Sequence, residues 1–211
     1  RKKILIRKNL SIYEAMNEGI KYASGEFIQI LNSDDILNSN FIIEETIKKI
    51  QKNLDHDVFF GNVVYFSQNN YYKINRYFAA NYNRVKNLLF GDMPPHPASF
   101  IKKKIYKDYG LYNTKFKIAS DFDFFVRILN IHKVKYKILK KDIVRMRTGG
   151  TSDKNIKSYI ITTKEILQSI KNNNLRLYRL KIIFRAVVKI KEFFLFNQKI
   201  LNKNFKIFNT N

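Results

Sequence analysis

Apolar and polar residues follow one another in blocks along residues 4–31, and their spacing predicts a strand, a helix and a second strand. The short apolar run 4–6 is typical of a strand. Ser11 and Glu14 have the spacing of a capping box and predict the start of an amphipathic helix, which Gly25 would end in the left-handed conformation. The nearly uniform apolar run 27–31 is typical of a buried parallel strand. The pattern therefore predicts a βαβ unit.

Further along the chain, the pattern predicts a second amphipathic helix with Ile43, Ile47 and Ile50 toward the core. A β-hairpin is expected from strands at 58–66 and 71–74. The proline-rich segment 93–97 can be neither regular helix nor central strand, and we expect a shaped loop there.

A late helix is expected to begin at Ser120, which has the character of an N-cap, with Asp121 in the first turn. Short strands are expected at 135–139 and 143–146, followed by a small-residue loop at 148–152 and by a helical remainder. One helical face of the late helix is apolar: Phe122, Phe125, Val126 and Leu129.

Composition limits the classes to which the protein can belong and the partners that it can bind. The 211 residues are 45% hydrophobic, which is enough to form an ordered core. Their net charge of +23 would attract phosphate-bearing partners such as nucleotide sugars, anionic membranes or nucleic acids, although the base composition of a genome explains abundant lysine equally well. The absence of cysteine excludes disulfides, thiolate nucleophiles and cysteine-bound zinc.

Asp34 and Asp35 directly follow the predicted strand 27–31 and concentrate oxygen ligands at its carboxyl end. Such ligands suit magnesium or manganese that holds a diphosphate. A pair of aspartates can equally cap a helix or fill a turn, so the pair needs its surrounding sequence before it indicates a metal site.

That surrounding sequence resembles the family 2 glycosyltransferases of the GT-A fold, and the motifs occur in the family's order. The resemblance implies an α/β domain with a Rossmann-like mixed sheet flanked by helices, and an enzyme that moves a sugar from a nucleotide-diphospho-sugar to an acceptor hydroxyl with inversion. The matching segments are Tyr13–Ile20, Ala23–Ile28, Leu31–Asp35, Pro95–Phe100, Ala119–Arg127 and Gly149–Ser152.

The resemblance also implies roles for individual residues. Asp35 would coordinate the divalent metal, and Asp34 would contact the ribose or the metal's water shell. Asp121 would be the catalytic base, although a carboxylate that only stabilises the helix dipole is the alternative. His96 would contact donor phosphates or the acceptor, with a hydrogen bond inside its loop as the alternative. Asp123 would assist by hydrogen bonding, or else cap the helix together with Ser120.

The chain also departs from the family pattern. Residues 4–6 would correspond to the family's third strand, so we expect roughly the first quarter of the domain to be absent and this chain to bind the nucleotide sugar weakly. The expected organisation is a catalytic domain at residues 1–152 and a basic helical extension at 153–211.

The extension suggests where the protein acts. Basic residues Lys181, Arg185 and Lys189 line one side of a predicted helix, as in helices that lie on anionic membranes. A helix packed against the domain is the alternative. Without a signal peptide or a membrane-spanning run, the expected location is the cytoplasm, peripheral on the inner face of the membrane. Family members often use lipid-linked or saccharide acceptors, and the resemblance implies a role in surface polysaccharide, lipopolysaccharide or glycolipid synthesis.

Two other functions compete with this hypothesis. The charge and the interspersed aromatic residues would suit a nucleic-acid-binding module, but zinc-finger spacing, RNA-binding signatures and a helix-turn-helix are all absent from the sequence, so a nucleic-acid partner is not expected. A membrane-associated remnant without activity is the second alternative, against which Asp35 and Asp121 argue mildly.

Overall fold

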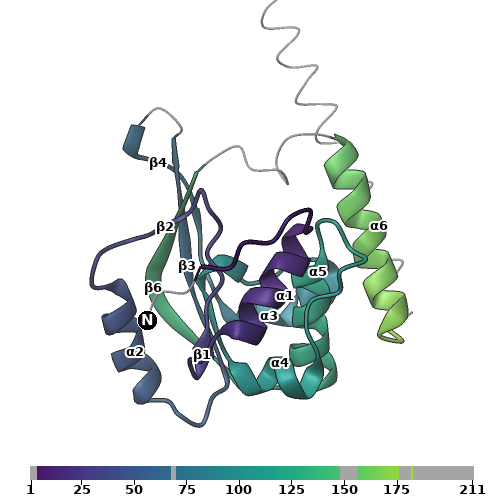
Figure 1. Cartoon of the computed structure of the whole chain (residues 1–211), viewed down its shortest axis with the longest axis horizontal. Coiled ribbons are helices and arrows are strands. Elements are labelled where there is room, and N and C mark those ends of the chain that lie inside the picture. The colour runs from purple at the N-terminus through teal and green to yellow at the C-terminus, as the bar shows by residue number, and fades with distance from the viewer. Residues whose placement is uncertain (1–3, 68–69, 148–155, 176–181, 183–211) are drawn as a thin grey trace, which may run out of the picture.

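Strand β3 (Val58–Ser67) forms the centre of a six-stranded mixed sheet in the computed structural model, which describes residues 4–67, 70–147, 156–175 and 182 (Figure 1). The strand order is β1-β5-β3-β6-β2, and β4 also pairs with β3. The other strands are β1 (Phe27–Ile28), β2 (Ile36–Leu37), β4 (Asn70–Phe78), β5 (Ser99–Lys102) and β6 (Tyr136–Arg147).

Both edges of β3 are paired. Along one edge, β5 pairs with residues 58–60 and β4 pairs with residues 63–67, both antiparallel. Along the other edge, β6 pairs in parallel with residues Val58 to Phe66 of β3. Asn62 lies where β5 ends and β4 begins, and its Oδ1 accepts a hydrogen bond of 3.0 Å from the backbone N–H of Ala80. Asn62 thus closes the gap between the two neighbours of β3.

Helices cover both faces of the sheet. Helix α2 (Ile42–Gln51) lies on one face, while α1 (Ile12–Tyr22), α4 (Lys103–Tyr109) and α5 (Ser120–Phe125) lie on the other, with α6 (Ile156–Asn172) packed against α5 (Figure 1). The short elements are α3 (Tyr82–Lys86), η1 (Leu88–Phe90), η2 (His96–Ala98) and the π-helix η3 (Val126–Ile131). The mixed sheet with flanking helices confirms the expected α/β class.

The alternation of side chains along β3 supplies a core to each face. Val58 and Phe60 belong to the core beneath α1 and α5. Phe59 and Val63 belong to the core beneath α2, together with Ile143 of β6. All five side chains are fully shielded from solvent.

Helix α1 confirms the capping-box prediction. The hydroxyl of Ser11 accepts from the backbone N–H of Glu14, and the Glu14 carboxylate accepts from the backbone N–H of Ser11 at 2.7 Å. The predicted end of the helix was wrong, because α1 stops at Tyr22 with an extended residue, Ala23, at its C-cap. Gly25 has no positive φ, since the chain already turns into β1 without it.

The predicted strand 4–6 was also wrong. Residues 4–7 have no regular structure, and Ile4, Leu5 and Ile6 are 72%, 41% and 80% exposed. No strand of the described chain pairs with this run, so its apolar side chains have no sheet on which to pack. The βαβ prediction fails with it: β1 is two residues long and pairs antiparallel with β5.

Several predictions for the rest of the chain are confirmed, and others are corrected by the structure. The hairpin of β3 and β4 is confirmed, and the segment 93–97 is an irregular stretch that passes into the short 3-10 helix η2 at His96. The second helix is present as α2, but Ile42 lies in the core in place of Ile43, which is exposed. The two strands expected at 135–139 and 143–146 are one strand, β6, because a bulge carries the pairing across the break. Ser120 is not an N-cap: α5 is preceded by Ala119, and the Ser120 hydroxyl lacks a partner within the described chain.

Some predictions fall outside the described residues. They are the loop 149–152, the boundary at 152 and the basic helix side of Lys181, Arg185 and Lys189. Among the helices that are described, none combines the length and the apolar character needed to cross a bilayer.

Gly61 has no side chain because Ile143 of the adjacent strand occupies the space. A Cβ at position 61 would lie 2.1 Å from Ile143 Cδ1 and 2.6 Å from Cγ1. The Ile143 side chain is fully buried in the core beneath α2. The contact therefore fixes how closely β3 and β6 approach each other.

Gly61→Ala should destabilise the protein by about 2 kcal/mol, because overpacking forces the neighbouring strand to shift. Ile143→Ala empties the same space, so the double variant should lose less stability than the sum of the two single losses. Urea denaturation measures all three. Gly19→Ala is the matched control, since a Cβ at position 19 meets nothing within 4 Å and alanine favours a helix. Strictly additive losses would contradict this packing.

Candidate active site

The acidic pair lies on the segment that crosses from β1 at one edge of the sheet to β2 at the other. Asp34 is exposed, whereas Asp35 is 6% exposed. Asn32 forms a turn with Asp35: its carbonyl accepts from the Asp35 backbone N–H at 3.2 Å, and its side-chain Nδ2 donates to Asp35 Oδ2 at 2.9 Å. This turn fixes the direction of the Asp35 carboxyl group.

The pKa of Asp35 is raised to about 6, mainly by burial; the hydrogen bond from Asn32 opposes the shift, and the nearby charge of Asp34 adds to it. Ionisation of a buried carboxyl group is costly, and a nearby cation would stabilise its ionised form. Since the hydrogen bond from Asn32 uses Oδ2, Oδ1 is left for another partner.

Within the described residues, no group of three or more histidine, cysteine, aspartate or glutamate side chains converges as a metal cage. Magnesium is commonly held by one or two carboxylates together with water and substrate phosphates. The adjacent oxygen donors of Asp34 and Asp35 fit that mode of binding, and they do not fit a metal enclosed by protein alone.

Asp121 lies in the first turn of α5. Its Oδ1 accepts from the backbone N–H of Phe122 at 2.8 Å, and the hydroxyl of Tyr13 on α1 lies 3.5 Å from the same oxygen. Burial raises the pKa of this carboxyl group, whereas the nearby His96 lowers it. Although the residue as a whole is partly exposed, burial of its carboxyl group is the largest influence on the pKa.

His96 is held within the core, where its charge and that of Asp121 influence each other. It is 8% exposed, and its Nε2 lies 2.7 Å from the Tyr112 hydroxyl. Burial lowers the pKa of the imidazole, and the charge of Asp121 opposes that shift. The hydrogen bond of Nε2 is a structural one, but its partner Tyr112 lies outside the loop 93–97 in which the sequence alternative placed it.

The loop that carries His96 also holds the acidic segment. Gln29, the residue that directly follows β1, donates from Nε2 to the carbonyl of Pro97 at 3.0 Å. The structure therefore ties the segment of Asp34 and Asp35 to the residue that follows His96, while His96 and Asp121 interact electrostatically. Asp35 and Asp121 themselves make no direct contact.

Asp123 has a structural environment that the sequence did not indicate. It is buried, and its Oδ1 accepts from the Ser169 hydroxyl of α6 at 2.6 Å. Asn173 lies 3.3 Å from the same oxygen, and Arg127 approaches Oδ2 at 3.7 Å. The carboxylate therefore joins α5 to α6 and does not accept from Ser120.

Glu165 of α6 is the residue that sequence reasoning missed. Its carboxylate accepts three backbone hydrogen bonds, from Lys117 at 2.7 Å, Ile118 at 2.9 Å and Ala119 at 2.8 Å. The hydroxyl of Tyr13 donates to the carbonyl of Ile118. The segment before Asp121 is thus fixed from two sides, and no local pattern could have indicated a cap that comes from a distant helix.

Glu165→Ala should lower the free energy of unfolding by about 2 kcal/mol, because it leaves three backbone N–H groups without their charged acceptor. Glu165→Gln should lie between this variant and the original chain, since it keeps one acceptor oxygen. Lys164→Ala, at an exposed position of the same helix, is the control. Equal stability of Glu165→Ala and Lys164→Ala in urea denaturation would exclude the capping role.

Asp121→Asn should stabilise the fold at alkaline pH. Because the folded pKa of Asp121 is raised, the folded state loses stability as the pH rises from the usual aspartate value of about 3.9 toward that raised pKa. Asparagine avoids this loss and still accepts from Phe122. Urea denaturation at several pH values should show the variant gaining on the original chain as the pH rises above about 3.9; a variant that gains nothing at any higher pH would contradict this.

Comparison with known proteins finds similarity to glycosyltransferases. A family model described as glycosyl transferase family 2 matches residues 1–110. An uncharacterized glycosyltransferase of Methanocaldococcus jannaschii is 27% identical over 145 residues, which are 66% of this chain and 48% of that protein. A PGL/p-HBAD biosynthesis glycosyltransferase of Mycobacterium bovis is 27% identical over 116 residues, 55% of this chain and 43% of the relative.

Solved structures share the fold. The crystal structure of S. aureus TarS in complex with UDP-GlcNAc matches with a TM-score of 0.53 at 16% identity, over 82% of this chain and 52% of the other. The similarity confirms the expected GT-A fold. The chain spans about half the length of the relatives that it matches.

Proposed function

The chain belongs to glycosyl transferase family 2, whose model covers more than half of its length, and from this membership we propose that it transfers a sugar from a nucleotide-diphospho-sugar to an acceptor hydroxyl with inversion. The observation that carries the proposal is the arrangement around the loop 93–98. The imidazole of His96 in that loop interacts electrostatically with the Asp121 carboxyl group, and Pro97 holds the segment of Asp34 and Asp35 through Gln29.

In the proposed reaction, the Asp121 carboxylate accepts the proton of the acceptor hydroxyl as that oxygen bonds to the anomeric carbon. The bond from that carbon to the diphosphate breaks, and its electron pair leaves with the diphosphate. A raised pKa supports this role, since a base works best when its pKa approaches the working pH. Attack from the face opposite the leaving group gives inversion.

Asp35, with Asp34 beside it, would hold a magnesium or manganese ion together with water and donor phosphate oxygens. When bound, such an ion stabilises negative charge on the departing diphosphate. The buried carboxyl group of Asp35, turned by Asn32 and with Oδ1 unused by that bond, supports this assignment. Asp34, which is exposed, would reach the ribose or the water shell of the ion.

His96 has a supporting role in this proposal. Its contact with Tyr112 fixes the imidazole, which affects the Asp121 carboxyl group electrostatically. A direct contact of His96 with the donor phosphates or with the acceptor would require Nδ1, since Nε2 is already engaged.

The acceptor is proposed to be a saccharide or a lipid-linked molecule at the inner face of the cell membrane, in surface polysaccharide or glycolipid synthesis. The name of the mycobacterial relative, which refers to PGL/p-HBAD biosynthesis, supports a biosynthetic glycosyltransferase. A net charge of +23 supports association with an anionic membrane surface.

Asp121→Asn should reduce manganese-dependent release of UDP from a panel of UDP-sugars by at least about a hundredfold, the usual contribution of a general base. Its binding of UDP with manganese, measured by calorimetry, should change little. Asp35→Asn should instead weaken that metal-dependent binding.

Asp108→Asn, an exposed aspartate of α4, is the control and should change neither measurement. Undiminished UDP release by Asp121→Asn would exclude its role as the base. UDP binding that is indifferent to both manganese and Asp35→Asn would exclude the proposed metal site.

A further inference from the structure

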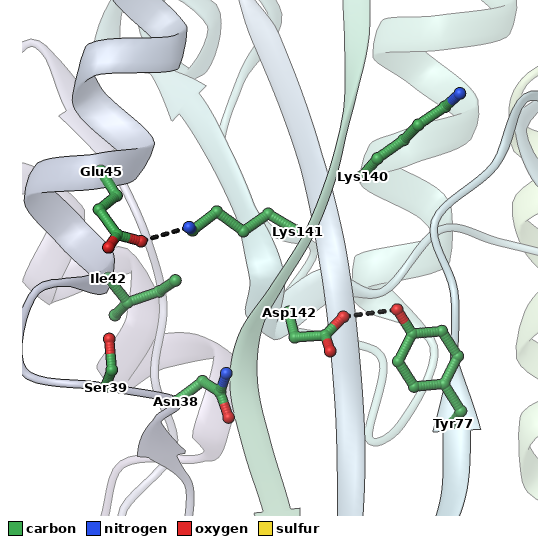
Figure 2. A pocket seen from close by; sticks show the side chains of 8 residues that line it. All are labelled: Asn38, Ser39, Ile42, Glu45, Tyr77, Lys140, Lys141 and Asp142. Atoms are coloured by element: carbon green, nitrogen blue, oxygen red, sulfur yellow. Dashed lines mark hydrogen bonds and ion pairs between the residues drawn. The ribbon is translucent and has the colours of Figure 1, made fainter.

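A second polar region lies away from the four residues discussed above. It is an open hollow of about 450 Å³ where β6 passes α2 and the segment after β2 (Figure 2). None of Asp34, Asp35, His96 and Asp121 lines it. Its lining residues are Asn38, Ser39, Ile42, Glu45, Tyr77, Lys140, Lys141 and Asp142.

The hollow exists because β6 bulges at this point. Between the pairs Phe60↔Ile138 and Asn62↔Asp142, the single residue Gly61 faces three residues of β6. Lys140, in the middle of the three, has a φ of 49°, which is costly for a residue with a side chain. Bulges often redirect side chains next to functional sites. Here, Lys140 and Lys141 leave the strand in different directions (Figure 2).

One wall of the hollow is held by hydrogen bonds among its own side chains. Asn62, which is buried, donates from Nδ2 to Asp142 Oδ1 at 2.8 Å and also to the Tyr77 hydroxyl, while the Tyr77 hydroxyl donates to Asp142 Oδ1. None of these bonds uses Oδ2 of Asp142, which is left to accept from a ligand. Side chains that are already ordered lose less entropy on binding.

The chemistry of the lining favours a neutral, hydroxyl-rich ligand. Two cationic side chains, Lys140 and Lys141, balance two anionic ones, Glu45 and Asp142, and Lys141 forms an ion pair with Glu45 across the hollow. Asn38 and Ser39 add groups that donate and accept hydrogen bonds. The lining contains a single aliphatic side chain, Ile42, too little for a lipid, and no excess positive charge for a polyphosphate.

Tyr77 adds an aromatic surface. The residue is 53% exposed although its hydroxyl is fixed by Asp142 and Asn62, so part of the ring is open to a ligand. An aromatic ring that is held by its hydroxyl offers apolar contact to the carbon face of a sugar, while the polar side chains around it bond the hydroxyl groups.

A short stretch of chain connects the hollow to the candidate metal segment. Asn38 follows β2, which directly follows Asp35, and its backbone N–H donates to the Ile143 carbonyl of β6 at 2.9 Å. At about 3.3 Å per extended residue, Asn38 lies within roughly 10 Å of Asp35 along the chain. A saccharide of more than one unit can therefore extend from the hollow toward that segment.

We propose that this hollow is a binding site for a neutral saccharide unit, which belongs to the acceptor chain and lies away from the hydroxyl that reacts. The identification of the saccharide as part of the acceptor rests on the proposed function; the site itself does not. Its main contacts are the Tyr77 ring, Oδ2 of Asp142 and the side chain of Asn38.

Saturation-transfer difference NMR with cellobiose, lactose and maltose tests the site, and binding in the millimolar range is expected for at least one of them. Tyr77→Leu should weaken that binding by about tenfold, equivalent to about 1.4 kcal/mol. Tyr82→Leu is the matched control, because Tyr82 is also 53% exposed and lies outside the hollow. If Tyr77→Leu does not fold, Asn38→Ala replaces it, since the bond from Asn38 to β6 is made by its backbone.

Four outcomes would overturn the proposal: no saturation transfer from any of the three sugars, binding that Tyr77→Leu and Asn38→Ala leave unchanged, equal weakening by Tyr82→Leu, and displacement of the sugar by inorganic phosphate. Calorimetry with UDP and manganese on the same variants separates the two proposals.

If sugar binding depends on Tyr77 but UDP does not bind, the result supports the saccharide site and contradicts the proposed transferase function. If UDP binds and the sugars do not, the reverse holds.

Discussion

The pairing of β3 on both of its edges is the constraint on which the rest of the structure depends. Its side chains alternate between two cores, so the strand positions α1 and α5 on one face and α2 on the other. Gly61 lets Ile143 approach, and Asn62 closes the gap between β4 and β5. Because β3 has no free edge along this stretch, a change in its register would move both cores and both candidate sites together.

The two sites differ in how they are held. Asp121 is positioned by hydrogen bonds from α1 and α6 that converge on the start of α5, so its place depends on packing between helices. The hollow is positioned by a bulge within the sheet and by the Asn62 side chain. A substitution that loosens the packing of α6 on α5 should therefore affect the first site while leaving the second intact.

The sequence predicted what local chemistry determines, and it failed where a distant partner decides. The Ser11–Glu14 capping box and the β3–β4 hairpin are confirmed, because both depend on residues close together in the chain. The strand at 4–6 was wrong because an apolar run becomes a strand only beside another strand. Of the candidate site, the sequence supplied Asp34, Asp35, His96 and Asp121 through resemblance. It could not supply Glu165, whose acceptor role depends on how α6 packs.

The carboxylate of Glu165 reaches backbone groups 46 to 48 residues earlier in the chain. During synthesis, the segment before Asp121 leaves the ribosome well before α6 exists, and at that stage its amide groups can bond only to water. The sheet can form first, since β6 precedes α6. The geometry around Asp121 is therefore completed among the last steps of folding, so that the nascent chain acquires its proposed base only after the scaffold is in place.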